Sequence, residues 1–173
     1  MSSNETRIDS GAAARHANHH GSHVVALEAG ADYRDSNVIV QGLIDFNASH
    51  TGGATPEDLV VTVRDEAGRV VGGLVGDTYV GWLQVHALWV GEGMRGRGIG
   101  RDILRTAEEE ALRRGCSQAF LETLSFQALA FYEKLGYTVN SRLDGFPPGG
   151  ARYALVKTLG PGPAAAPARN GAT

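Results

Sequence analysis

One stretch of the chain, residues 82–115, reads WLQVHALWVGEGMRGRGIGRDILRTAEEEALRRG and changes its pattern twice. Its first nine residues form an apolar run rich in β-branched and aromatic side chains, which predicts a strand. After a glycine-rich turn, apolar residues recur four positions apart from Ile103 to Ala111, and Gly115 follows them. This spacing with a terminal glycine predicts a helix over residues 99–114. The stretch therefore places a glycine-rich turn between a strand and a helix.

The other predicted elements follow from apolar periodicity and turn residues. Helices are expected over residues 35–50 and 125–135, and strands over residues 59–64, 70–76, 118–123, 137–143 and 152–159. Ser125 is the expected cap of the second of these helices. The turn before residue 82 is expected either at Gly76-Asp77 or at Val80-Gly81. This order predicts an α+β fold with a mixed, mostly antiparallel sheet flanked by helices, in which a crossover helix joins two parallel strands.

The composition is that of one soluble domain. A length of 173 residues suits a single core. A formal net charge of -3 gives no general attraction to nucleic acid or to anionic membranes. Cys116 is the only cysteine, so no internal disulfide forms and a reducing compartment is favoured. Without a signal-peptide run or an apolar stretch of membrane-spanning length, we expect a cytoplasmic protein with no nucleic-acid or membrane partner, and we leave open a homodimer.

The two ends of the chain differ from its middle. Residues 1–21 are mostly small and polar and are expected to form a flexible leader. Residues 160–173 form a Pro/Ala/Gly tail that is expected to be disordered, so the folded domain is predicted at residues 22–159. Four of the six histidines cluster at the leader: His16, His19, His20 and His23. No carboxylate or predicted element frames them, so we expect a solvated segment and assign no metal, although metal binding by the leader is left open.

The turn before residue 99 holds five glycines within ten residues, from Gly91 to Gly100. Glycine at a helix start costs ~1 kcal/mol against alanine, so its repeated use indicates that the backbone approaches something closely. Successive N–H groups at a helix N-terminus bind anions, and the helix dipole adds to the attraction. Three arginines add positive charge at the same place: Arg95, Arg97 and Arg101. We therefore predict a local anion-binding site in a chain of net negative charge.

Two nucleotide-binding patterns compete for this turn. Residues 91–96 fit the dinucleotide pattern G-x-G-x-x-G, with Glu122 as a ribose contact at the end of the next strand. A dinucleotide fold would place this unit first and continue with alternating parallel strands, whereas three predicted strands precede it here. Glu122 also lies 26 residues beyond Gly96, rather than the usual ~20. The dinucleotide interpretation is therefore disfavoured.

The second pattern lies at residues 95–100. Their sequence, RGRGIG, resembles the R/Q-x-x-G-x-G/A pyrophosphate loop of the GNAT superfamily of N-acetyltransferases. A further block, ALAFYEKLGY at residues 128–137, is similar to the A-x-x-F-Y-x-K-x-G-F/Y signature of that family. The resemblance covers residues 39–159 and is strongest over residues 85–137. It implies a GNAT-like sheet whose central parallel strands splay apart, and an N-acetyltransferase of the bacterial small-molecule type.

The resemblance also implies acetyl-CoA as co-substrate. The main chain of the strand that ends at Val90 would pair with the pantetheine arm, and the loop amides would hold the pyrophosphate. The residues expected to bind the cofactor are Leu88, Trp89, Val90, Arg95, Gly96, Arg97, Gly98, Ile99, Gly100, Arg101, Ser125 and Tyr132. Ser125 stands where many members of the family carry asparagine. Tyr132 matches the tyrosine that protonates the departing thiolate.

The expected catalytic residues are Tyr132 as general acid and His86 or Glu122 as general base. An alkyl amine is almost wholly protonated at neutral pH, so a group must take its proton before the nitrogen attacks. His86 stands where many members of the family have a glutamate, and histidine serves as a base near neutral pH. Glu122, at the end of the next strand, is the second candidate, or it orients a cationic acceptor instead.

We therefore expect transfer of the acetyl group of acetyl-CoA to a primary amine of a small molecule by direct attack. The acceptor pocket is expected among residues 45–47, Trp82 with Gln84, and the loop at residues 146–150. A short chain without a second recognition domain favours a small acceptor. The alternatives are a non-catalytic CoA-binding sensor or regulatory module, and a protein N-acetyltransferase.

Overall fold

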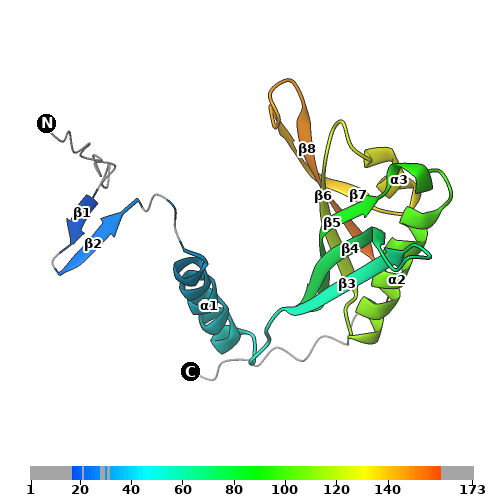
Figure 1. Cartoon of the computed structure of the whole chain (residues 1–173). Coiled ribbons are helices and arrows are strands. Elements are labelled where there is room, and N and C mark those ends of the chain that lie inside the picture. Colours follow the sequence, from blue (N-terminus) through cyan, green and yellow to red (C-terminus); the bar gives the residue numbers. More distant parts are fainter. Residues whose placement is uncertain (1–16, 21, 28–29, 31, 161–173) are drawn as a thin grey trace, which may run out of the picture. The chain divides into compact units, whose positions relative to one another are not determined.

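The computed structural model describes residues 17–20, 22–27, 30 and 32–160 (Figure 1). The chain divides into two units, residues 1–47 and residues 48–173, and each is described by itself. Most of the predicted leader, with His16, lies outside the described residues, as does the predicted tail after residue 160. The domain limits of 22–159 therefore stay a prediction.

The first unit holds a two-stranded hairpin and most of a helix. β1 (Ala17–His20) pairs antiparallel with β2 (His23–Ala26). The sequence analysis did not predict this hairpin, whose first strand falls within the predicted leader, because β1 has neither the alternation nor the β-branched residues of a strand. α1 (Tyr33–His50) confirms the predicted helix, and the carboxylate of Asp32 accepts a backbone N–H of its first turn.

The second unit is built on a six-stranded sheet with the strand order β3-β4-β5-β6-β8-β7 (Figure 1). Its strands are β3 (Glu57–Arg64), β4 (Val70–Tyr79), β5 (Trp82–Val90), β6 (Gln118–Leu124), β7 (Thr138–Asp144) and β8 (Ala151–Thr158). All neighbouring strands are antiparallel except β5 and β6, which are parallel. The predicted α+β fold with a mixed, mostly antiparallel sheet is confirmed.

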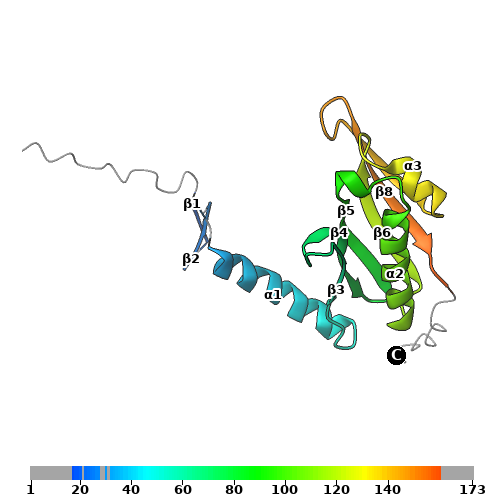
Figure 2. The same ribbon diagram turned by 45° about the vertical axis from the view of Figure 1, so that its right-hand side comes forward.

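Helix α2 (Ile99–Arg113) makes the crossover between the two parallel strands and lies along one face of the sheet (Figure 2). It buries its apolar stripe against β3, β4 and β5, and Gly115 follows its last turn as predicted. The fully buried side chains of the core include Leu74, Leu83, Leu104, Leu121 and Leu155. None of the helices in the described part of the chain is long and apolar enough to span a membrane.

The turn between β4 and β5 lies at Val80-Gly81, the second of the two predicted positions. Both residues have positive φ, 47° and 80°, as a tight hairpin turn of this kind requires. The first position is wrong because Gly76 lies inside β4. A Cβ at Gly76 would come within 2.3 Å of the carbonyl oxygen of Gln84, so glycine is needed there for close packing of two strands rather than for a turn.

The second predicted helix is shorter than expected. Helix α3 comprises Leu129–Lys134, and Ala128 precedes it without a side-chain cap. The prediction that Ser125 caps this helix is therefore wrong. The Ser125 hydroxyl accepts the N–H of Ala151 at 3.1 Å, and the Ser125 N–H donates to the Ala151 carbonyl at 2.8 Å. Ser125 thus ties the end of β6 to the start of β8, since its hydroxyl is used across the sheet.

The two parallel strands separate beyond their first four residue pairs. β5 and β6 pair from Trp82 opposite Gln118 to Val85 opposite Leu121, although both strands continue. At the same point the register of β5 on β4 shifts and leaves His86 as an extra residue, a β-bulge. The splay of the central strands, which the resemblance implied, is confirmed, and it opens a gap between the carboxyl ends of β5 and β6.

Candidate active site

Three cavities follow one another along the gap between β5 and β6. The loop cavity, of about 660 Å³, lies at the glycine-rich turn and is lined by Leu88, Phe131 and residues of that turn. The tyrosine cavity, of about 300 Å³, also includes Leu88 and Phe131 and adds Tyr132. The ion-pair cavity, of about 340 Å³, shares His86 and Glu122 with the tyrosine cavity. Each cavity therefore shares lining residues with the next.

The glycine-rich turn presents a row of backbone donors to the loop cavity. Within the described residues, the N–H groups of residues 96–101 donate no hydrogen bond, because the first backbone bond after the turn runs from the Asp102 N–H to the Gly98 carbonyl. Gly96 and Gly98 have φ of 75° and 81°, a left-handed conformation that favours glycine. Six consecutive unpaired N–H groups at the start of α2 match the predicted anion site.

The three arginines of the turn differ in their positions. Arg95 and Arg101 line the loop cavity, where Nε of Arg95 donates to the Val90 carbonyl at 3.1 Å and Arg101 pairs with Asp102 at 3.0 Å. Arg97 is exposed, and its side chain makes no hydrogen bond or ion pair within the described residues. The structure thus brings two of the three predicted cations to the cavity.

The predicted cofactor residues of β5 lie along the gap. Leu88, Trp89 and Val90 line the loop cavity, and the side of β5 that faces β6 has no ladder partner beyond Val85. An extended chain could therefore pair with β5 there as an additional strand. Ser125 does not line any of the three cavities, since its hydroxyl binds β8.

Tyr132 points its hydroxyl into the tyrosine cavity. The side chain is only 7% exposed and packs edge-to-face on Phe131 and Tyr137, with ring centroids 5.1 Å and 6.0 Å away. Its hydroxyl makes no hydrogen bond within the described residues, and none of their buried polar side-chain atoms lacks a partner, so the hydroxyl reaches the cavity. Burial raises the pKa of Tyr132 above its ordinary value, which keeps the phenol protonated at neutral pH.

His86 forms a pair with an acidic residue that the sequence analysis missed. Nε2 of His86 lies 2.5 Å from Oδ2 of Asp77 on β4. The Asp77 side chain is 13% exposed and also accepts Nε2 of Gln84 at 3.3 Å, whereas the imidazole is 55% exposed. Asp77 therefore contacts an imidazole that lines both the tyrosine cavity and the ion-pair cavity. One of the two predicted turns lay at Gly76-Asp77, and a residue of a turn was not expected to pair with His86.

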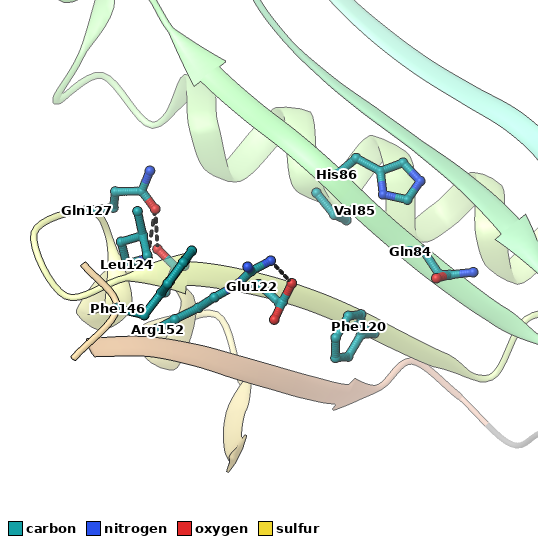
Figure 3. A pocket seen from close by; sticks show the side chains of 10 residues that line it. Gln84, Val85, His86, Phe120, Glu122, Leu124, Gln127, Phe146 and Arg152 are labelled. Atoms are coloured by element: carbon teal, nitrogen blue, oxygen red, sulfur yellow. Dashed lines mark hydrogen bonds and ion pairs between the residues drawn. The ribbon is translucent and has the colours of Figure 1, made fainter. Parts of the chain in front are cut away.

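Glu122 and Arg152 form an ion pair inside the ion-pair cavity (Figure 3). Nη2 of Arg152 donates to Oε2 of Glu122, and the guanidinium lies over the ring of Phe146 at 5.3 Å. Arg152 was not among the predicted site residues, because nothing in the sequence around it indicates that β8 lies beside β6. The pair engages one carboxylate oxygen of Glu122, Oε2, with a cation.

The predicted acceptor pocket is present in part. Gln84 and Phe146 line the ion-pair cavity with Phe120, and Trp82 lines a neighbouring hollow that shares Gln84 and Phe120 with this cavity. Residues 45–47 of α1 belong to the first unit, whereas the residues that line the three cavities belong to the second unit. Within the described residues no group of three or more His, Cys, Asp or Glu side chains is placed to hold a metal ion.

The diverging parallel strands, the glycine-rich turn and the buried tyrosine lie together along one gap of the second unit. The sequence profile of the acetyltransferase (GNAT) family matches residues 40–137, more than half of the chain. The chain belongs to this family. The predicted resemblance is confirmed, as is the predicted class of enzyme, an acetyltransferase that uses acetyl-CoA.

Individual relatives support the same family. Acetyltransferase Atu2258 of Agrobacterium fabrum is 43% identical over 108 residues, which cover 62% of this chain and 79% of that protein. Blasticidin-S acetyltransferase of Streptomyces morookaense is 41% identical over 95 residues, which cover 54% of this chain and 70% of that protein. The crystal structure of an acetyltransferase from Agrobacterium tumefaciens superposes with a TM-score of 0.72 at 39% identity, covering 76% of this chain and 96% of that one.

Proposed function

We propose that the protein moves the acetyl group of acetyl-CoA to a primary amine of a small molecule, by direct attack within a complex that holds both reactants. The observation that carries this proposal is the order of the three cavities. An anion-binding loop, a protonated tyrosine and a polar space walled by aromatic rings follow one another along one gap. Both reactants can therefore meet beside Tyr132 and His86.

The loop and β5 would hold the cofactor. Acetyl-CoA supplies a thioester, whose acetyl group is activated for attack, and a pyrophosphate that serves as the anion to be bound. The N–H groups of residues 96–101 would donate to the pyrophosphate, and Arg95 and Arg101 would add charge. The open side of β5 from Leu88 to Val90 would bind the pantetheine amides.

His86 would take the amine proton. Asp77 orients the imidazole by accepting a hydrogen bond from one ring nitrogen, which leaves the other nitrogen as a proton acceptor. The acceptor nitrogen then forms a C–N bond to the acetyl carbon as the C–S bond breaks, and the nitrogen loses its second proton to solvent to give the neutral amide. His86 passes the proton it has taken to solvent.

Tyr132 would complete the exchange at sulfur. Its hydroxyl gives a proton to the departing thiolate, so that CoA leaves as a thiol, and Tyr132 regains a proton from solvent. Because a thiol has a pKa near ~8.5, the thiolate is a good leaving group, and this proton contributes a modest factor. The raised pKa of Tyr132 suits the role, since the donor stays protonated until it is needed.

The volume of the ion-pair cavity supports a small acceptor. The ion-pair cavity measures about 340 Å³, close to the lower limit of ligand pockets, which run from about 300 to 1,000 Å³. One relative is named for the acetylation of blasticidin S, a small molecule. A peptide acceptor would call for an extended groove rather than a cavity of this volume.

A thiol-release assay tests the proposal. The protein is given acetyl-CoA and a panel of small primary amines, and free CoA is measured with a thiol-reactive dye, with a series of synthetic peptides that carry free amines as the comparison. We expect amine-dependent CoA release, and acetylated amine in equal amount by mass spectrometry. Binding of acetyl-CoA without release on any amine would overturn the proposal in favour of a non-catalytic CoA-binding module. Release with peptides alone would favour a protein acetyltransferase.

A further inference from the structure

We infer that the acceptor is a zwitterion, in which a carboxylate lies close to the amine that is acetylated, and that Arg152 binds this carboxylate. This inference rests on the proposed function and names the class of its acceptor. The ion pair between Arg152 and Glu122 carries it, because this pair lies inside the ion-pair cavity that His86 also lines (Figure 3). Glu122 and His86 further line the tyrosine cavity. An amino acid, or a larger molecule with an amino-acid moiety, has the required arrangement of charges.

The ion pair leaves most of its hydrogen-bonding capacity for a ligand. Within the described residues, Oε1 of Glu122 accepts no hydrogen bond, and Nε and Nη1 of Arg152 donate none. Both side chains are a little over one third exposed, so a ligand in the cavity reaches them. A guanidinium has five N–H donors and binds a carboxylate through two parallel bonds, so Arg152 can hold Glu122 and a second carboxylate together.

The charges of the cavity favour a zwitterion over a simple amine. An acceptor with only an ammonium group would be attracted by Glu122 and repelled by Arg152, whose charges nearly cancel at this distance. A zwitterion completes a ring of four alternating charges, with its ammonium at Glu122 and its carboxylate at Arg152. Phe146 stacks on the guanidinium at 5.3 Å and so supports the plane in which Arg152 presents its donors.

The positions of the two charges also set the spacing on the acceptor. Glu122 and His86 line both the tyrosine cavity and the ion-pair cavity, whereas Arg152 lines only the latter. The amine would therefore lie at Glu122 and His86, next to the thioester, with the carboxylate on the side away from Tyr132. Because Glu122 and Arg152 are in direct contact, the amine and the carboxylate of the acceptor must be only a few bonds apart, as in α- and β-amino acids.

Binding of matched ligands tests this inference without relying on turnover. α- and β-amino acids, their carboxamides and the corresponding decarboxylated amines are titrated by calorimetry into the full-length protein saturated with CoA. We expect at least one amino acid to bind about tenfold or more tightly than both its amide and its decarboxylated amine. Equal binding of acid and amide, or no binding by any amino acid of the panel, would overturn the inference.

Three variants assign the preference to one side chain. In Arg152→Gln the preference for the acid over the amide should disappear. In Arg152→Lys the preference should be retained in part, because the lysine ammonium keeps the positive charge but cannot form the bidentate pair with a carboxylate. Arg142→Gln is the matched control, since Arg142 lies on β7, pairs with Asp144 and lines none of the three cavities. Its preference should equal that of the parent protein. Equal loss of acid and amide binding in Arg152→Gln, with unchanged thermal stability, would indicate that Arg152 only positions Glu122 and would overturn the inference.

The thiol-release assay on the same ligands separates the two proposals. If plain amines and amides release CoA as fast as amino acids, the acetyl transfer stands and the zwitterion inference fails. If amino acids bind selectively but no amine releases CoA, the acceptor class stands and the proposed transfer fails.

Discussion

Replacement of Tyr132 by phenylalanine removes one hydroxyl and separates chemistry from packing. That hydroxyl makes no hydrogen bond within the described residues, and the ring is held by Phe131 and Tyr137, contacts that phenylalanine keeps. The free energy of unfolding should therefore change by no more than about 0.5 kcal/mol. General acids contribute about 10²–10⁴ in rate, and a thiolate leaves easily, so we expect kcat to fall about 100-fold, or ~2.7 kcal/mol.

The neighbouring tyrosine provides a matched control with the opposite outcome. The hydroxyl of Tyr137 donates to Oε1 of Glu108 at 3.0 Å, and Nζ of Lys157 lies 2.6 Å from the other carboxylate oxygen. Tyr137 is 2% exposed, so Tyr137→Phe takes a partner from a largely buried carboxylate and should cost about 1–3 kcal/mol of stability. Its kcat should stay within about twofold of the parent value, because that hydroxyl does not reach the tyrosine cavity.

Three quantities measured on both variants decide between the roles. Thiol release at saturating acetyl-CoA and amine gives kcat, and the KM for acetyl-CoA and the thermal midpoint are recorded beside it. The expected result is a loss of kcat without a loss of stability in Tyr132→Phe, and the reverse in Tyr137→Phe. A parent-like kcat in Tyr132→Phe, or a loss that follows the thermal midpoint in both variants, would refute the assignment of Tyr132 as the proton donor.

Three further predictions concern the loop, the base and an acid-sensitive ion pair. Gly98→Val places a β-branched residue at a φ of 81° beside Arg101, so the Kd for acetyl-CoA by calorimetry should rise at least tenfold; an unchanged Kd would contradict the loop assignment. Asp77→Asn weakens the hydrogen bond that orients His86, so kcat should fall about tenfold while the KM for acetyl-CoA stays the same. A tenfold change in that KM beside the fall in kcat would argue against a role of Asp77 in positioning His86. Hydrogen bonds from Arg113 and Arg114 lower the pKa of Glu110 from 4.5 to about 2, so its contribution to stability is present above pH 4.5 and is lost as the pH falls toward about 2. The difference in unfolding free energy between the parent and Glu110→Gln should therefore shrink across this range in urea titrations, and a difference that does not change with pH would count against it.

The elements that the sequence predicted well are those with strong local signals. The limits of β5 and of α2 were predicted to within one residue, because an apolar run ends at Val90 and the stripe from Ile103 to Ala111 ends before Gly115. The end of β4 was predicted wrongly, because a glycine at position 76 is compatible both with a turn and with the close approach of two strands. Only the strand pairing, with the Gln84 carbonyl 2.3 Å from a Cβ at Gly76, distinguishes the two cases.

The residues of the candidate site also fall into two groups, those with a local sequence signal and those without one. The loop and Tyr132 lie in contiguous blocks of sequence, so an anion site could be predicted from the residue types of the loop, and a role for Tyr132 from the family resemblance that its block carries. Asp77 and Arg152 lie on strands that are far from those blocks in sequence and reach the site only through the strand order, in which β4 and β8 flank the two splayed strands. A strand order that inserts β8 between β6 and β7 cannot be derived from local pattern, because each strand alone is compatible with several neighbours.

The β-bulge at His86 links the fold to the chemistry. Before the bulge, Leu83 and Val85 are buried on the core side of β5, and after it Leu88 and Val90 pack against the same core. The core-facing positions therefore change from every second residue to a spacing of three between Val85 and Leu88, which shifts the alternation by one residue. A bulge bends and twists its strand, and the pairing with β6 ends at Val85, the residue directly before it. The single extra residue thus turns β5 away from β6, and that residue is itself the imidazole that faces the opening. Every residue from Ala87 to Val90 is apolar, so the parity change leaves no trace in the hydrophobic pattern. His86 could therefore be proposed as a base from the sequence, but the cause of its exposure could not be predicted.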